Sequence, residues 1–213
     1  DHNHNRTVLV SVEPGARMVE VHCEGVVVTS DSAGVIGHHS GHMPLWSFLS
    51  QSALTRPGPK VRAIMAGLDV PRDEPLAMLH RLSALVVEAV DYVPGETSVH
   101  TSGEEAALIG AGVCQDHAHI FIGAARALGV PARYVSGYLM MNDRIEQEAS
   151  HAWAEAWLGN RWVSFDVSNA RSGAGAHLKL AIGLDYSDAC PIRGVRLGGG
   201  NEELSTSAQV RAG

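Results

Sequence analysis

Apolar residues recur at helical spacing in two long stretches of the chain. The first begins after Pro75 and stops before Pro94, with apolar positions at Leu76, Leu79, Leu82, Val86 and Val90. The second spans residues 113–128, with apolar positions at Ala118, Phe121, Ile122, Ala125 and Leu128. Apolar residues three and four apart form one face of a helix, and proline or glycine marks its ends. We therefore predict two amphipathic helices, the second ended by Gly129 and Pro131.

Two neighbouring stretches, 151–158 and 161–166, have the character of strands and flank the dipeptide Gly159-Asn160. This dipeptide is typical of a two-residue hairpin turn. With such a loop Asp166 faces position 153, two residues from His151. Side chains alternate between the faces of a strand, so His151 and Asp166 are expected on one face as diagonal neighbours about 7–8 Å apart. A shift of one residue in register would place them on opposite faces.

The first 110 residues contain weaker patterns. Residues 7–12 and 18–29 flank a turn signal at 13–16, which predicts a β-hairpin. Residues 30–44 are rich in glycine, serine and histidine and are typical of a linker. Residues 45–68 are expected to be partly helical, with an interruption at 56–59. Further on, Thr101 and Glu104 match a capping box and predict a short helix over 104–109.

Composition narrows the class of protein. The chain has 213 residues, of which 45% are hydrophobic and 18% charged, which is ordinary for a globular protein. A net charge of -7 and only 5% aromatic residues argue against a nucleic-acid partner, because phosphate binding needs a basic face. No apolar run is long enough to span a membrane, and no signal peptide is visible. Three cysteines, Cys23, Cys114 and Cys190, fit unpaired thiols better than a disulfide framework, so we expect a cytoplasmic protein.

Cys114 stands at the start of the helix predicted over 113–128, four residues before Ala118 on the same apolar stripe. Its thiol should therefore face the packed interior. Unpaired backbone N–H groups and the helix dipole favour an anion in the first turn, and a thiolate is the form that attacks carbonyls. The helix needs a sheet face to pack on, and we expect the face of His151 and Asp166. This arrangement predicts a nucleophile, its base and the orienting partner of the base.

Five motifs occur in a fixed order along the chain. They are Gly-Val-Cys-Gln-Asp at 112–116, Ala-Leu-Gly-Val-Pro-Ala-Arg-Tyr-Val-Ser-Gly-Tyr at 127–138, His-Ala-Trp-Ala-Glu at 151–155, Phe-Asp at 165–166 and Ala-Ile-Gly-Leu-Asp-Tyr at 181–186. Together they resemble the transglutaminase-like superfamily, specifically its bacterial members described as cysteine proteases. The resemblance implies an α+β fold with a papain-like core, in which the cysteine helix packs on an antiparallel sheet. It also implies Cys114 as nucleophile, His151 as base and Asp166 as orienting residue.

The resemblance divides the chain into three parts. Residues 70–213 correspond to the transglutaminase-like catalytic domain, and residues 31–69 to a linker and helical segment. Residues 1–30 resemble the tail of the β-rich amino-terminal domain usual in these bacterial proteins. Two positions depart from the pattern: relatives usually have an aromatic residue in place of His117 and a proline in place of Val167. We expect the first departure to affect the pocket beside the thiol, and therefore substrate choice.

The predicted function is that of a thiol enzyme that acts on an amide carbonyl of a peptide or protein substrate through a thioester. Water would make it a cysteine peptidase or amidase, and an amine would make it a transglutaminase. The chain shows no built amine site, which slightly favours hydrolysis. The contrasting hypothesis is a non-catalytic interaction module in which Cys114 is an inert buried thiol. The backbone N–H of Cys114 is the expected oxyanion donor. Gln115 and Asp116 either help to position the substrate or the oxyanion site, or the acid is a solvated first-turn residue.

No metal or cofactor is expected. His117 and His119 could be combined with Cys114 and His151 into a metal cluster, but side chains two apart on a helix diverge and no second thiol lies nearby in sequence. The chain has no clustered acidic loop typical of calcium sites and no glycine-rich phosphate loop. The expected partner is therefore a peptide or protein substrate, with neither a nucleic acid nor a membrane.

Overall fold

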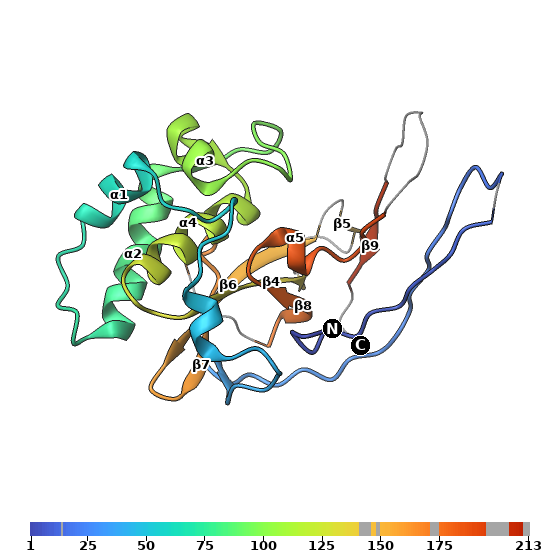
Figure 1. Ribbon diagram of the computed structural model, residues 1–213, viewed down its shortest axis with the longest axis horizontal. Helices are drawn as coiled ribbons and strands as arrows, with labels where there is room; N and C mark the ends of the chain where they lie inside the picture. The colour runs from blue at the N-terminus through green and yellow to red at the C-terminus, as the bar shows by residue number, and fades with distance from the viewer. Residues whose placement is uncertain (14, 141–145, 148–149, 171–174, 195–204, 211–213) are drawn as a thin grey trace.

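A curled antiparallel sheet forms the centre of the protein (Figure 1). The computed structural model describes residues 1–13, 15–140, 146–147, 150–170, 175–194 and 205–210. The sheet has the strand order β1-β7-β6-β4-β8. Its strands are β1 (Val35–Gly37), β4 (Ala132–Leu139), β6 (His151–Leu158), β7 (Arg161–Phe165) and β8 (His177–Gly183). Two-residue strands form two further pairs: β2 (Asp91–Tyr92) with β3 (Ala111–Gly112), and β5 (Glu146–Gln147) with β9 (Ala208–Gln209).

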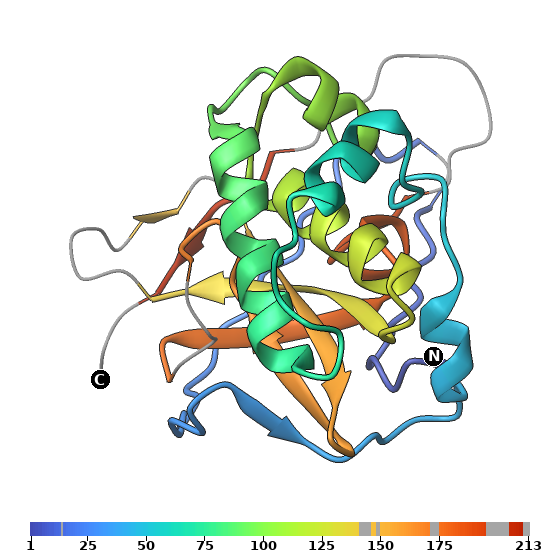
Figure 2. The ribbon, with the colours of Figure 1, turned by 90° about the vertical axis from the view of Figure 1, so that its left-hand side faces the viewer.

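Four α-helices lie together on one side of the sheet (Figure 2). They are α1 (Pro59–Ala66), α2 (Pro75–Ala89), α3 (Gly103–Ile109) and α4 (Cys114–Ala127). The 3-10 helix η1 (Leu45–Leu49) lies apart from them, with Phe48 against the ring of Trp162, and the short α5 (Tyr186–Ala189) follows β8. The two long predicted helices are thus confirmed within a few residues. Together with the antiparallel sheet they make the expected α+β fold.

Helix α4 is the centre of the core. It contacts α1, α2 and α3 on one side and β4 and β6 on the other, so every residue from 114 to 126 is buried. The prediction of an amphipathic helix was therefore incomplete, because the other helices cover its polar face as well. Arg126 tolerates burial because its guanidinium donates to the carbonyl oxygens of Ala132 and Leu184 and to Oγ1 of Thr55.

The face of the sheet under α4 is built from small side chains. Ala152, Ala154 and Ala156 of β6 belong to the main hydrophobic core together with α4, whereas Trp153 does not. Successive residues of a strand point to opposite faces, so Trp153 and Glu155 face away from the helix. His151 lies on their face, but it is the first residue of β6 and reaches Cys114 at the end of the sheet. This corrects the expectation that α4 packs on the face of His151 and Asp166. Alanines allow a helix to approach the sheet more closely than a row of tryptophan and glutamate would.

The opposite face of the sheet holds a buried ion network. The carboxylate of Glu155 is fully buried and accepts hydrogen bonds from Nε of Arg133 (2.7 Å) and Nζ of Lys179 (2.8 Å). The guanidinium of Arg133 in turn lies 4.0 Å from the centre of the Trp162 ring. These contacts join β4, β6, β7 and β8 on the side of the sheet opposite α4.

The β6–β7 hairpin has the predicted register. Leu158 pairs with Arg161, and Ala154 pairs with Phe165. Gly159 and Asn160 both have positive φ, 53° and 74°, as the two central residues of a type I′ turn require. His151 and Asp166 therefore share one face, as the sequence predicts.

The prediction of an amino-terminal hairpin over 7–12 and 18–29 was wrong, since the described residues there form no strand. The segment extends away from the body of the molecule (Figure 1), with a turn in which the N–H of Ala16 donates to the carbonyl of Glu13. An isolated two-stranded ribbon is only marginally stable in water, and the segment has no third strand to pair with here. The predicted linker instead contains β1, which pairs with β7. The assignment of residues 1–30 to a β-rich domain stays a prediction.

The capping box of α3 lies one residue later than predicted. Ser102 and Glu105 exchange the two capping hydrogen bonds, in place of Thr101 and Glu104. The carboxylate of Glu104 accepts the backbone N–H groups of Gly58, Lys60 and Val61 at the start of α1. Glu104 therefore satisfies unpaired donors of a neighbouring helix, a role that local sequence cannot show.

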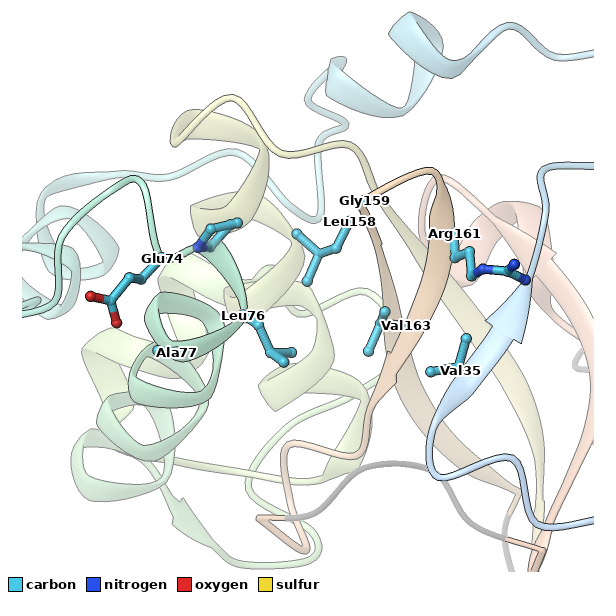
Figure 3. Close-up of a pocket in the computed structure, with 9 residues that line it drawn as sticks. Val35, Glu74, Leu76, Ala77, Leu158, Gly159, Arg161 and Val163 are labelled. Atoms are coloured by element: carbon cyan, nitrogen blue, oxygen red, sulfur yellow. The ribbon is translucent and has the colours of Figure 1, made fainter.

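An apolar hollow of about 550 Å³ lies between the start of α2 and the β6–β7 turn (Figure 3). Leu76, Leu158 and Val163 line it. It lies at the end of β6 remote from His151, roughly 23 Å along the strand at 3.3 Å per residue. Across the described ranges, no helix combines the length and apolar character needed to cross a membrane.

Candidate active site

Cys114 is the first residue of α4, and only 8% of it is exposed. The first turn of the helix is held by Asp116, whose Oδ2 accepts the N–H of Val113 (2.8 Å) and the hydroxyl of Thr97 (2.6 Å). Burial raises the pKa of Asp116, and these hydrogen bonds act against the increase. Asp116 is fully buried, so the alternative of a solvated first-turn acid is wrong. Asp116 fixes the helix start from which the thiol projects.

His151 is the first residue of β6 and lies between Cys114 and Asp166. Its side chain hydrogen-bonds with the Cys114 side chain, and its Nε2 lies 3.0 Å from Oδ2 of Asp166. The three residues meet because α4 and β6 begin, and β7 ends, at one end of the sheet. The structure thus brings together all three predicted site residues, although α4 packs on the opposite face from the one expected.

Asp166 follows β7 and is fully buried. Its Oδ2 accepts from His151, from Nε2 of His177 (2.8 Å) and from Nδ2 of Asn169 (2.8 Å). Burial alone would raise the pKa of this carboxyl, but the hydrogen bonds hold its pKa well below the usual range. An ionised carboxylate only accepts hydrogen bonds, so Nε2 of both histidines must hold a proton. Nδ1 of His151 is then the ring nitrogen left for the thiol.

The pKa of His151 is raised from 6.5 to about 9. Burial acts against the charged ring, but the hydrogen bonds to Asp166 and Cys114 outweigh it. The imidazolium is therefore the favoured form of His151 at neutral pH. A ring of this kind can hold the proton of the thiol and later deliver it to a leaving group.

The range occupied by these residues matches a family model. The model for the transglutaminase-like superfamily matches residues 62–167, which include Cys114, His151 and Asp166. The chain belongs to the transglutaminase-like superfamily. This membership confirms the resemblance drawn from the five sequence motifs.

One solved structure of the same superfamily fold is described as a "putative cysteine protease" from Cytophaga hutchinsonii. It superposes with a TM-score of 0.60 and 28% sequence identity, over 68% of this chain and 49% of that one. The chain is also 36% identical over 126 residues to an uncharacterized protein of Mycobacterium leprae, covering 57% of this chain and 45% of that protein. An uncharacterized protein of Mycobacterium tuberculosis is 33% identical over 146 residues, 63% of this chain and 46% of its own length. The chain thus spans less than half the length of these curated relatives.

His117, which we expected to depart from the superfamily pattern, makes two hydrogen bonds within the fold. Its Nε2 donates to the carbonyl of Val90 (3.0 Å), so its Nδ1 accepts from the hydroxyl of Ser168 (2.9 Å). Burial lowers its pKa, in keeping with a neutral ring. The contact with Ser168 ties α4 to the turn that follows Asp166. An effect of His117 on the pocket beside the thiol stays a prediction.

His119 is fully buried, and its Nε2 accepts the backbone N–H of Tyr186 (3.2 Å). Burial lowers its pKa to about 4. His117 and His119 thus serve the fold. Within the described ranges a different group, His151, Asp166 and His177, brings three ligand atoms of suitable types within 4.8 Å of one another. In the structure, hydrogen bonds join these same atoms.

Trp153 covers the buried side of the site. Its ring stacks on His151, with centroids 6.0 Å apart, and meets the His177 ring edge-on at 5.2 Å. Gly137 of β4 makes room for it, because a Cβ there would lie 2.6 Å from the tryptophan ring and 2.1 Å from the carbonyl of Leu178. An apolar cover of this kind excludes water and strengthens the hydrogen bonds beneath it.

The sequence analysis did not identify His177 or Asn169. Asn169 lies three residues after Asp166, a spacing that could have suggested a local hydrogen bond. No sequence pattern pointed to His177. It comes close to Asp166 only because β8 pairs with β4, a strand that is distant from it in sequence.

Proposed function

We propose that this protein is a thiol enzyme in which Cys114 attacks the amide carbonyl of a peptide or protein substrate. The observation that supports it most is the pairing of His151 with both other residues of the triad: its Nε2 with the ionised Asp166 and its ring with Cys114. Asp166 fixes the tautomer, so that Nδ1 of His151 exchanges the proton with the thiol.

In the reacting state Nδ1 of His151 already holds the proton of the thiol, since the raised pKa of His151 favours the charged ring. The Cys114 sulfur then forms a bond to the carbonyl carbon, and the carbonyl electrons move to the oxygen. The backbone N–H of Cys114 can stabilise this oxyanion, because it stands among the unpaired donors at the start of α4. The imidazolium returns its proton to the nitrogen as the C–N bond breaks, which releases an amine and leaves a thioester on Cys114.

Water is the proposed acceptor of the acyl group, which makes the enzyme a cysteine peptidase or amidase. The similarity to the Cytophaga hutchinsonii structure described as a "putative cysteine protease", at 28% identity, supports this choice. Transfer to an amine is the alternative within the superfamily. Three unpaired cysteines support a reducing compartment, and on this ground we propose a cytoplasmic location.

Trapping of the acyl-enzyme tests the proposal. The protein is incubated with a peptide library, with and without a labelled primary amine, and adducts are mapped by mass spectrometry. We expect adducts on Cys114 and cleaved peptides without label. Label in the product would instead assign amine transfer. The Cys114→Ala variant is the control, and products formed equally by this variant would refute the thiol mechanism.

A further inference from the structure

Asp166 serves two imidazoles, and the proposed reaction uses only one of them. We propose that His177 is a positioning residue of the active site, whose Nε2–H holds the Asp166 carboxylate in the orientation that receives His151. This inference rests on the proposed function of Cys114 and adds a fourth side chain to the triad. Nothing in the sequence motifs assigns His177 a role.

The contact is short and buried. Nε2 of His177 lies 2.8 Å from Oδ2 of Asp166, compared with 3.0 Å for His151, and 5% of the His177 side chain is exposed. A hydrogen bond from a neutral or charged ring to a buried carboxylate is among the stronger kinds in proteins. Its geometry is therefore able to restrain the rotamer of Asp166.

His177 comes from a part of the fold that the rest of the triad does not use. It is the first residue of β8, which pairs with β4 and is separated from β7 by both β4 and β6. Asn169, the other donor to Oδ2, lies three residues from Asp166 in the adjoining turn. Asn169 therefore moves with that turn, whereas His177 fixes the carboxylate relative to the far strand of the sheet.

The ring of His177 is itself held in place. Trp153 packs edge-on against it, and the His151 ring lies 5.9 Å away, centroid to centroid. Trp153 thus contacts both imidazoles that donate to Asp166. A catalytic side chain must be held to within a fraction of an ångström, and this shell of packed rings supplies the restraint.

The experiment compares His177→Phe, which keeps a ring but removes the donor, with His177→Gln, whose amide can donate to the same oxygen. Leu180→Ala, at a half-exposed position of β8, is the matched control for perturbation of the strand. Two quantities are measured: the rate at which iodoacetamide alkylates Cys114 at neutral pH, and the ¹⁵N-resolved NMR signal of the His151 Nε2–H. Melting temperatures establish that each variant is folded.

We expect His177→Phe to slow alkylation of Cys114 by about 10- to 100-fold, the cost of a misplaced catalytic group. The same variant should weaken the downfield shift of the His151 Nε2–H. His177→Gln should recover most of the rate, and Leu180→Ala should match the wild type in both measurements.

Three outcomes would overturn the proposal. His177→Phe could retain both the wild-type rate and the His151 signal. The rate of Cys114 alkylation could fall as far in His177→Gln as in His177→Phe, which would indicate that His177 acts by packing and not as a hydrogen-bond donor. Stoichiometric zinc could be retained by the wild type and lost from His177→Gln, which would assign the cluster to a metal. If wild-type Cys114 reacts no faster than the exposed Cys23, the proposed function fails, and the NMR signal alone then decides the role of His177.

Discussion

Nε2 of His151 lies 3.0 Å from Oδ2 of Asp166, although 15 positions and a hairpin turn separate the two residues. The turn fixes the register of β6 and β7, and the register fixes the face on which both side chains lie. The ionised carboxylate then determines which nitrogen of the imidazole holds the proton. Local turn chemistry thus leads directly to the tautomer on which the proposed reaction depends.

Replacement of Asp166 by asparagine should remove this control. The Asp166→Asn variant loses the acceptor that selects the Nε2–H tautomer of His151, and we expect kcat for the acyl-transfer reaction to fall about 10³- to 10⁴-fold. Asp185→Asn is the matched control, because Asp185 is also buried but caps α5. A similar loss in both variants would indicate a general effect on folding.

The raised pKa of His151 predicts a basic limit to catalysis. The leaving amine needs the imidazolium proton, so kcat should decline as the pH rises through about 9, where His151 loses its charge. The pH profile of kcat measures this limit directly. A rate that is flat from pH 8 to 10.5 would contradict the assignment of His151 as the proton donor.

The same shift affects stability. A histidine whose pKa is raised on folding stabilises the protein fully below its unfolded value of 6.5, and this contribution is lost as the pH rises through about 9. The free energy of unfolding should therefore fall between pH 6.5 and 9. His151→Gln, which leaves Asp166 in place but removes the titrating ring, should show a smaller decline over this window. Urea titrations at a series of pH values provide the measurement.

The buried His119 should make the free energy of unfolding depend on pH below 6.5. Its pKa is lowered to about 4 by burial, with Asp185 acting against the shift and Arg126 adding to it. Unfolding exposes a histidine that binds a proton below pH 6.5, so this stability is present above 6.5 and is lost as the pH falls toward 4. The loss is roughly 3 kcal/mol at 1.4 kcal/mol per pH unit. His119→Gln, which retains an acceptor for Tyr186, should flatten the curve between pH 6.5 and 4, and an unchanged slope would refute this origin.

Gly137→Ala should test the packing behind the site. Its Cβ would lie 2.1 Å from the Leu178 carbonyl and 2.6 Å from the Trp153 ring, so β4 and β8 must separate or the ring must move. We expect a loss of about 2–3 kcal/mol in the free energy of unfolding. Gly129→Ala, just after α4, is the control. Its Cβ would meet no atom within 4 Å, but φ is +86°, so its loss of stability comes from backbone strain alone. Alkylation of Cys114 should slow in Gly137→Ala and stay unchanged in Gly129→Ala.

The features predicted well from sequence are those set by neighbouring residues. A two-residue turn fixed the pairing of Leu158 with Arg161, and Gly129 marked the end of α4. The packing face of β6 was predicted wrongly, because both of its faces are buried and hydrophobicity alone does not separate them. The run of Ala152, Ala154 and Ala156 was the available signal, since small residues mark close approach of a helix.

Contacts between distant segments were the part that sequence could not supply. Glu104 caps a helix more than 40 positions away, and His177 reaches Asp166 from a strand whose partner is β4. Each depends on how the sheet and helices pack in three dimensions. The grouping of Cys114, His151 and Asp166 was predictable because His151 and Asp166 lie on one hairpin and Cys114 begins a helix with clear ends.

The relative reactivity of Cys114 and Cys23 tests the central claim most directly. Both thiols are unpaired in one molecule, Cys114 buried beside His151 and Cys23 exposed, so Cys23 serves as an internal reference. Iodoacetamide is added at pH 6, and modification of each cysteine is followed by mass spectrometry in the wild type and in His151→Ala. We predict that Cys114 reacts about tenfold faster or more despite its burial, as an activated thiolate does, and that His151→Ala removes the difference. Slower reaction of Cys114 than of Cys23 in the wild type would mark it as an inert buried thiol and contradict the account.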